Sequence, residues 1–261
     1  MDNDSKKRRT RYLAVSIVFF TAAAVFALFA AGYKLKRLRA LNNQTALRDE
    51  VSRELEGPKE KQFNGIVIPD RGIDWAALKT LNPDIIGYIY IPGTRIDGPV
   101  LKHPSDRDFY LTHAVDGSDD EDGSFCADDT WNGFSSYNTV IRARSAGNGS
   151  GFSTLSFLGD KDFFERSPYI FLYTPSKTFI LEIFSAYHCK EEEILTDFSP
   201  GEDFTAYLDS IFATKDLNAN FRRETMVRLD DNARILSCVA LSEDGDEGDY
   251  AVQAVLLNTE E

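Results

Sequence analysis

The side chains of this chain that could carry chemistry are the thiols and imidazoles of six residues: Cys126, Cys189, Cys238, His103, His113 and His188. A thiol acts as a nucleophile in its thiolate form, and an imidazole can carry a proton near neutral pH. A cysteine and a histidine brought together would therefore indicate acyl transfer through sulfur. The cysteines are widely spaced and form no CxxC pair, so neither a zinc knuckle nor a dense disulfide framework is predicted. A single disulfide is an open alternative.

Local spacing does not bring these groups together. His188 and Cys189 are adjacent at the expected end of a strand, where neighbouring side chains point to opposite faces, so a dyad there is not expected. Cys238 lies within another expected strand. We interpret it either as a small buried residue of the sheet or as a nucleophile.

Two loops are rich in carboxylates, DGSDDEDGS at Asp116–Ser124 and SEDGDEGD at Ser242–Asp249. Closely spaced carboxylates suit Ca²⁺, and Asp244, Asp246 and Asp249 are the weak candidates for such a site. Neither loop follows the EF-hand pattern, and solvated acidic turns are the alternative interpretation. Carboxylates near a thiol also disfavour its ionisation.

The charge of the chain is partitioned along its length. Residues 1–39 hold nine Lys/Arg and two Asp/Glu, whereas residues 40–261 hold 20 basic and 40 acidic groups, a net charge of −20. Such a body repels phosphate backbones, so we expect no nucleic-acid partner, while cations and basic protein surfaces remain compatible. The chain has no phosphate-binding glycine motif, no HExxH and no GxSxG, and no cofactor is predicted.

An uncharged run of 21 residues, Leu13–Tyr33, has the length of a membrane-spanning helix. A cleaved signal peptide is the alternative, but the run is long for one, and basic residues follow it at once. Basic residues are slightly more numerous before the run than after it, which favours an N-terminus inside the cell. We therefore expect a cytoplasmic tail at 1–12, a membrane span at 13–33, a stalk at 34–73 and an extracellular domain at 74–261.

Beyond Asp74, which is expected to cap a short helix, short runs rich in β-formers alternate with turn residues. The expected strands are Ile85–Ile91, Gly98–Leu101, Ser124–Ala127, Asn138–Arg142, Tyr169–Tyr173, Phe179–His188, Arg234–Leu241 and Tyr250–Leu257. Helical spacing appears in Asp160–Arg166 and in Glu202–Ala213, whose apolar stripe is expected to pack on the sheet. Many short strands at this spacing predict a barrel or a sandwich.

Several longer stretches resemble one known family. They are NPDIIGYIYIPGTRIDGPVLK from Asn82, DFYLTHAVDG from Asp108, NTVI from Asn138, DKDFFERSPYIFLYTP from Asp160, LEIFSAY from Leu181 and TDFSPGEDFTAYLDSI from Thr196. From about Asp74 to Leu257 the chain resembles a class B sortase, a Gram-positive cysteine transpeptidase that attaches surface proteins to the cell wall. The resemblance implies an eight-stranded sortase β-barrel with N-terminal helices and a helix before the penultimate strand. It also gives His113 a place outside the family's catalytic trio, as a structural hydrogen-bonding residue.

The same resemblance locates the family's catalytic Cys, His and Arg, which serve as nucleophile, proton donor and oxyanion-stabilising cation. The histidine follows NTVI by an aromatic residue and a glycine, which places its position at Arg144. The family's last two strands, laid without gaps on Ile235–Val252, place the cysteine at Leu241 and the arginine at Asp249. No Lys, Arg or His occurs from Ile235 to the end of the sequence, so no shift of register supplies the arginine.

We therefore expect a catalytically inactive, sortase-like membrane protein at the cell surface. It would bind or scaffold a cell-wall or pilus protein, a sorting-signal peptide or an active sortase. Arg142, Arg144, Leu241 and Asp249 are the candidates for the binding groove, and the two arginines are expected to pair with Asp249. The alternative is an active cysteine transpeptidase or peptidase with Cys238 as a displaced nucleophile. It is disfavoured because residues three apart in a strand, such as 238 and 241, face opposite sides.

Overall fold

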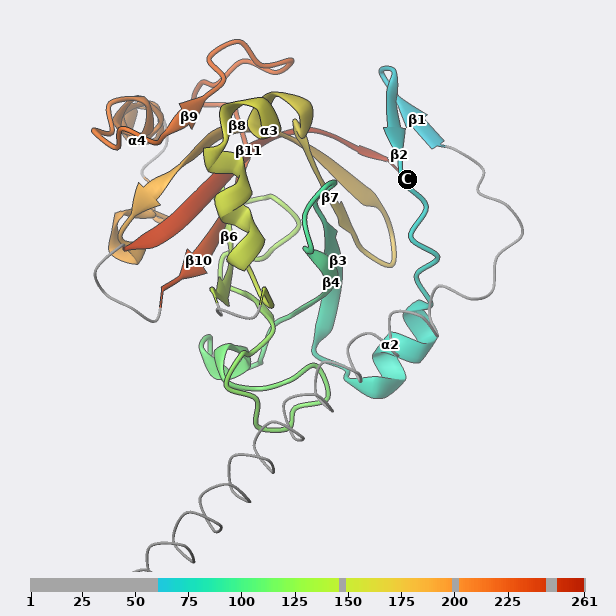
Figure 1. The fold of residues 1–261 in the computed structure, drawn as a ribbon. Coiled ribbons are helices and arrows are strands. Elements are labelled where there is room, and N and C mark those ends of the chain that lie inside the picture. The colour runs from blue at the N-terminus through green and yellow to red at the C-terminus, as the bar shows by residue number, and fades with distance from the viewer. Residues whose placement is uncertain (1–60, 146–148, 199–201, 243–247, 261) are drawn as a thin grey trace, which may run out of the picture. The chain divides into compact units, whose positions relative to one another are not determined.

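Eight strands close into a barrel because the last strand, β11, pairs with β10 on one edge and with β8 on the other (Figure 1). The computed structural model describes residues 61–145, 149–198, 202–242 and 248–260. The order around the barrel is β11-β10-β6-β5-β4-β3-β7-β8. The barrel strands are β3 (Ile85–Tyr90), β4 (Asp97–Leu101), β5 (Phe125–Ala127), β6 (Asn138–Arg144), β7 (Tyr169–Tyr173), β8 (Thr178–Cys189), β10 (Ile235–Leu241) and β11 (Asp249–Glu260).

The expected barrel is thereby confirmed, and each of the eight predicted strands is present. A short ninth strand, β9 (Asn220–Phe221), adds to the side of β8. β6 differs from its predicted end at Arg142 and continues to Arg144, because β10 runs parallel beside it and pairs Leu241 with Arg144. Strand length is set here by the neighbouring strand, which supplies the ladder partners.

Helices cover parts of the barrel. The predicted helix before the penultimate strand is α4 (Glu202–Phe212), and Phe204, Leu208 and Ile211 on its apolar stripe are buried, as expected. The other helical elements are α2 (Trp75–Leu81), η1 (Phe109–Leu111), η2 (Ser153–Gly159), α3 (Lys161–Arg166) and η3 (Glu191–Glu193). Asp74 caps α2 as predicted, since its carboxylate accepts a hydrogen bond from the Ala77 amide at 2.9 Å.

A buried polar network joins α4 to the sheet. The Gln253 side chain accepts hydrogen bonds from Ser185 and Tyr187 at 3.0 and 3.2 Å. Its amide group donates to Tyr207 of α4 at 2.9 Å and to Ser237 at 3.0 Å. Every polar atom of the Gln253 side chain therefore has a partner, which removes the penalty for burying an amide among apolar residues.

Among the described residues, no helix has the length and apolar character that a membrane crossing requires. The expected span Leu13–Tyr33, the tail before it and the stalk up to residue 60 lie outside the described residues. The membrane anchor therefore stays a prediction.

The folded unit begins before Asp74, which corrects the predicted boundary of the stalk. Residues 61–68 form a hairpin of β1 (Lys61–Phe63) and β2 (Ile66–Ile68). Ile66 and Ile68 are buried in the same apolar cluster as Leu78 of α2. The apolar pattern of residues 61–68 is too short to predict that Ile66 and Ile68 are buried. Their burial results from contact with the rest of the domain.

The hairpin provides a matched pair of stability variants. Ile68 is 4 % exposed, whereas its neighbour Val67 is 45 % exposed. We expect Ile68→Ala to lower the free energy of unfolding by about 2–4 kcal/mol, because it leaves a cavity in a packed cluster. Val67→Ala should change it by less than about 1 kcal/mol. Urea unfolding of the full chain in detergent micelles measures both, and equal effects would contradict the inclusion of the hairpin in the core.

Candidate functional site

Three strands bring together, at one end of the barrel, the positions that the resemblance assigns to the catalytic residues. The parallel pairing of β6 with β10 sets Arg144 beside Leu241, and the antiparallel pairing of β10 with β11 sets Ala240 beside Tyr250. Asp249, the residue before Tyr250, therefore follows next to Leu241 at the start of β11. The structure thus places Arg144, Leu241 and Asp249 on adjacent strand ends.

Cys238 lies on the other face of β10. Its side chain is 0 % exposed and packs in the cluster that contains Leu236, Ala240 and Val252, while Leu241 contacts the two other clusters. Burial raises the pKa of the Cys238 thiol well above its ordinary value. The thiol is therefore held in its protonated form, away from the strand ends.

The Asp249 carboxylate binds backbone amides. One of its oxygens accepts a hydrogen bond from Ser242 at 3.0 Å, and the other accepts one from Glu191 at 2.9 Å. These bonds hold the end of β10 and the start of η3 to β11. The expected pairing of Arg142 with Asp249 is corrected: Arg142 pairs with Glu191 and Asp108 instead.

Arg142 is a buried cation with an almost complete set of partners. Its side chain is 2 % exposed, and its guanidinium donates to Asp108 at 2.6 Å, to Glu191 at 2.9 Å and to the Arg107 carbonyl at 2.8 Å. Burial alone would lower its pKa, but the hydrogen bond to Asp108 and the charge of Glu191 outweigh it, and the pKa of Arg142 is raised. Arg142 therefore stays charged and ties three segments together.

Arg144 holds the same segment at its other end. Its Nε donates to the Leu111 carbonyl at 2.9 Å. The Cys126 thiol, opposite Arg142 across β5 and β6, donates to the Arg107 carbonyl at 3.0 Å. Side chains of β5 and β6 thus fasten residues 106–111 onto the barrel.

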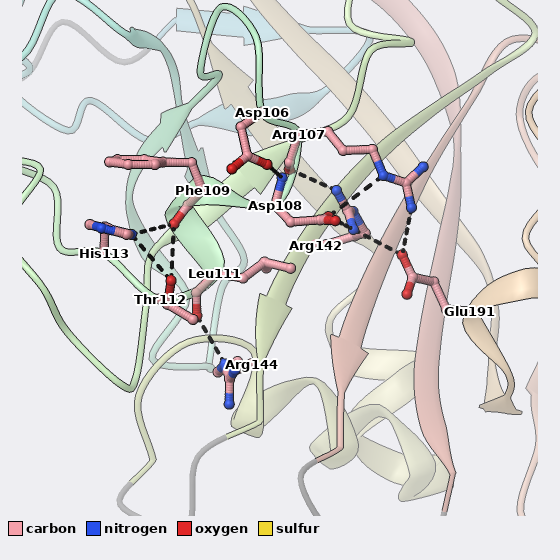
Figure 2. A pocket seen from close by; sticks show the side chains of 10 residues that line it. All are labelled: Asp106, Arg107, Asp108, Phe109, Leu111, Thr112, His113, Arg142, Arg144 and Glu191. Atoms are coloured by element: carbon pink, nitrogen blue, oxygen red, sulfur yellow. Dashed lines mark hydrogen bonds and ion pairs between the residues drawn. The ribbon is translucent and has the colours of Figure 1, made fainter.

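A pocket of about 420 Å³ opens between these segments (Figure 2). It is lined by Asp106, Arg107, Asp108, Phe109, Leu111, Thr112, His113, Arg142, Arg144 and Glu191. Two of the four predicted groove residues, Arg142 and Arg144, belong to this lining, whereas Leu241 and Asp249 do not. Asp106, Asp108 and Glu191 were missed by sequence reasoning, because no motif or local spacing links them.

Stacked rings form one wall of the pocket. The ring of Phe109 lies between His103 at 4.4 Å and His113 at 3.7 Å, measured between centroids. The His113 Nδ1 is 2.7 Å from the Phe109 carbonyl, which can only accept, so His113 donates there. This agrees with the prediction that His113 has a structural hydrogen-bonding role.

The remaining thiol and imidazole are set apart from each other. His188 is exposed and bonds to Asp216 at 3.1 Å, while the adjacent Cys189 is buried on the opposite face of β8. Burial and the nearby Asp249 raise the pKa of Cys189 to about 12. All three cysteines are free thiols, so the open alternative of a disulfide is not realised.

The candidate calcium residues do not form a site in the described part of the chain. Asp244 and Asp246 lie outside the described residues, and both oxygens of Asp249 bind amides. Within the described ranges, no three His, Cys, Asp or Glu side chains are placed to share a metal ion. In the other acidic loop, the Asp116 carboxylate accepts hydrogen bonds from the Ser118 hydroxyl and amide, and these bonds lower its pKa.

Comparisons with known proteins point to one family. No family model matches the chain. The sortase B of Listeria monocytogenes is 28% identical over 219 residues, which cover 83% of this chain and 85% of that protein.

Solved structures agree with this relative. The X-ray structure of Clostridium perfringens sortase B is 30% identical, with a TM-score of 0.64, and the match covers 71% of this chain and 100% of that one. A Staphylococcus aureus sortase B–substrate complex, at 23% identity and a TM-score of 0.61, shares the fold over 70% of this chain and 84% of that one. With the same closed eight-stranded barrel and this level of identity over a whole sortase B domain, the chain belongs to the class B sortase family.

Proposed function

We propose that this protein is a catalytically inactive member of the class B sortase family, anchored in the cell membrane with its barrel outside the cell. It binds or scaffolds a surface protein, a sorting-signal peptide or an active sortase. The pocket beside β6 is its binding site, and no cofactor takes part.

One observation carries the proposal: the adjacent ends of β6, β10 and β11 present Arg144, Leu241 and Asp249. A guanidinium stays protonated near neutral pH and cannot shuttle a proton, and a leucine has no nucleophile. Asp249 brings a negative charge to the position from which the family's arginine stabilises an oxyanion. The set therefore lacks a nucleophile, a proton carrier and a cation in the required places.

The alternative of a displaced nucleophile finds little support. Cys238 is fully buried on the opposite face of its strand, and its burial raises the thiol pKa. Cys126 lies close to the pocket, but it is also buried, and burial raises its pKa to about 11. A thiol that is neither exposed nor ionised is a poor nucleophile.

The pocket supports a binding role. Its volume of about 420 Å³ lies within the usual range of ligand sites, and its lining offers acidic and basic groups together with the ring of Phe109 and the side chain of Leu111. The Staphylococcus aureus sortase B of similar fold has been solved with a substrate. A peptide or an extended segment of a surface protein is therefore the ligand that we favour.

Thiol labelling tests the absence of a nucleophile. In the native full chain we expect none of the three cysteines to react rapidly with a thiol-directed reagent, and all three to react after unfolding. Leu241→Cys should add one fast thiol, because residue 241 is partly exposed. Rapid labelling of Cys238 in the folded protein would contradict the proposal that the protein is catalytically inactive.

Activity assays with Cys238→Ala separate the two functions. We expect neither the full chain nor this variant to cleave or join sorting-signal peptides, because no thiolate stands at the strand ends. Mass spectrometry of the peptide products is the measurement. Turnover that the wild type shows and Cys238→Ala loses would instead establish the displaced nucleophile.

Site-specific crosslinking tests the binding role. A photo-crosslinking residue at Thr112, which is exposed and lines the pocket, is expected to capture an envelope protein in intact cells. The same residue at exposed position Lys215, outside the pocket, serves as the matched control. Identical crosslinks from both positions, or none from Thr112, would count against the pocket as the binding site.

A further inference from the structure

We propose that the pocket takes a basic side chain of a polypeptide partner, with carboxylates of its lining binding the ammonium or guanidinium group. This inference rests on the proposed binding function and names the chemistry of the partner.

Three carboxylates of the lining keep an oxygen that has no partner within the described part of the chain. Asp106 uses one oxygen to accept the Asp108 amide at 3.0 Å. Asp108 and Glu191 each use one oxygen to bind Arg142. Their second oxygens line or border the pocket and are free to accept hydrogen bonds from a ligand (Figure 2).

The charges around the pocket favour a cation. Arg107 lies 3.6, 3.8 and 3.7 Å from Asp108, Asp128 and Glu191, too far for hydrogen bonds. The lining holds the carboxylates of Asp106, Asp108 and Glu191 and the three guanidinium groups of Arg107, Arg142 and Arg144. Asp128 adds a fourth carboxylate beside Arg107, outside the lining. The body of the chain outside residues 1–39 carries a net charge of −20, which attracts basic partners over a longer range.

The shape of the pocket favours an elongated organic cation over a metal ion. Within the described ranges, no three acidic or imidazole side chains converge closely enough to hold a metal. One wall carries the stacked rings of Phe109 and His113 and the side chain of Leu111. Such a wall suits the aliphatic stem of a lysine or arginine, whose charged head can then reach the carboxylates.

A second feature points to a polypeptide and away from a free amine. The Arg142 side chain is 2 % exposed, and its Nε–H has no hydrogen-bond partner in the part of the chain that the structure describes. A buried donor without a partner is costly and calls for an acceptor. A backbone carbonyl of a polypeptide would supply such an acceptor, whereas a free amine in its charged form offers none.

Isothermal titration calorimetry on the full chain in detergent micelles tests the proposal. The probe is an acetylated, amidated peptide of sequence glycine–lysine–glycine, compared with its glutamine counterpart, n-butylamine and Ca²⁺. We expect the lysine peptide to bind most tightly. Its affinity should fall as salt is raised from about 50 to about 500 mM, because exposed charges are screened.

Asn variants remove charge and keep the local hydrogen bonds. Asp106→Asn can still accept the Asp108 amide, and Asp108→Asn can still accept from Arg142. We expect the double variant to bind the lysine peptide about tenfold more weakly. Asp160→Asn is the control, because asparagine also caps a helix well and Asp160, the cap of α3, is outside the pocket.

Three results would overturn the inference. The first is that the lysine peptide does not bind at about 10 mM, a concentration that detects Kd values well above the millimolar range. The others are that the glutamine peptide binds as tightly as the lysine peptide, or that the double variant and Asp160→Asn have equal affinity for the lysine peptide. Binding of n-butylamine or Ca²⁺ as tight as that of the peptide would show a free cation to be the ligand and would also overturn it. None of these results bears on catalytic inactivity, which thiol labelling and peptide turnover measure separately.

Discussion

The pairing of β11 with both β10 and β8 is the constraint on which the rest of the structure depends. It closes the sheet, so that β11 has a hydrogen-bonded neighbour on both sides and is not left as an open edge. It also sets the register in which Cys238 faces one apolar cluster and Leu241 faces the clusters on the opposite side of β10. A slip of one residue would turn every side chain of β10 to the wrong face, and the apolar clusters on both sides of the strand oppose it. The residues at the end of the barrel are thereby placed by the packing of the whole sheet.

Within that frame, the charged groups at the strand ends hold structure together. Arg142 binds Asp108 and Glu191, and Asp249 binds the amides of Glu191 and Ser242. A charge buried with its partners costs desolvation, but the loss of one partner costs more, because it leaves the other charge alone. These contacts make residues 106–111, η3 and the ends of β10 and β11 one connected unit. The pocket is the space that this unit leaves open.

Membership of the family rests on the barrel of this protein and not on the groups at its strand ends. The barrel is held together by apolar clusters and by the buried Gln253 network. A fold can therefore persist while the groups at its site change, and function must be argued from those groups. In the proposed function, the binding surface of a transpeptidase is retained and its chemistry is not.

The sequence by itself determined the eight strands, the Asp74 cap and the buried stripe of α4, because each depends on local patterns of a few residues. It also determined the family, through longer stretches that resemble it. Even the opposite orientations of Cys238 and Leu241 follow from the period of a strand. Only the tertiary structure decided that Ile66 and Ile68 are buried, that Asp249 binds amides in place of the arginines, and that Asp106, Asp108 and Glu191 share a pocket with Arg142. These contacts join residues as far apart in the chain as 108 and 191. No local pattern encodes them, since they are chosen by strand register and by the packing of distant segments against one another.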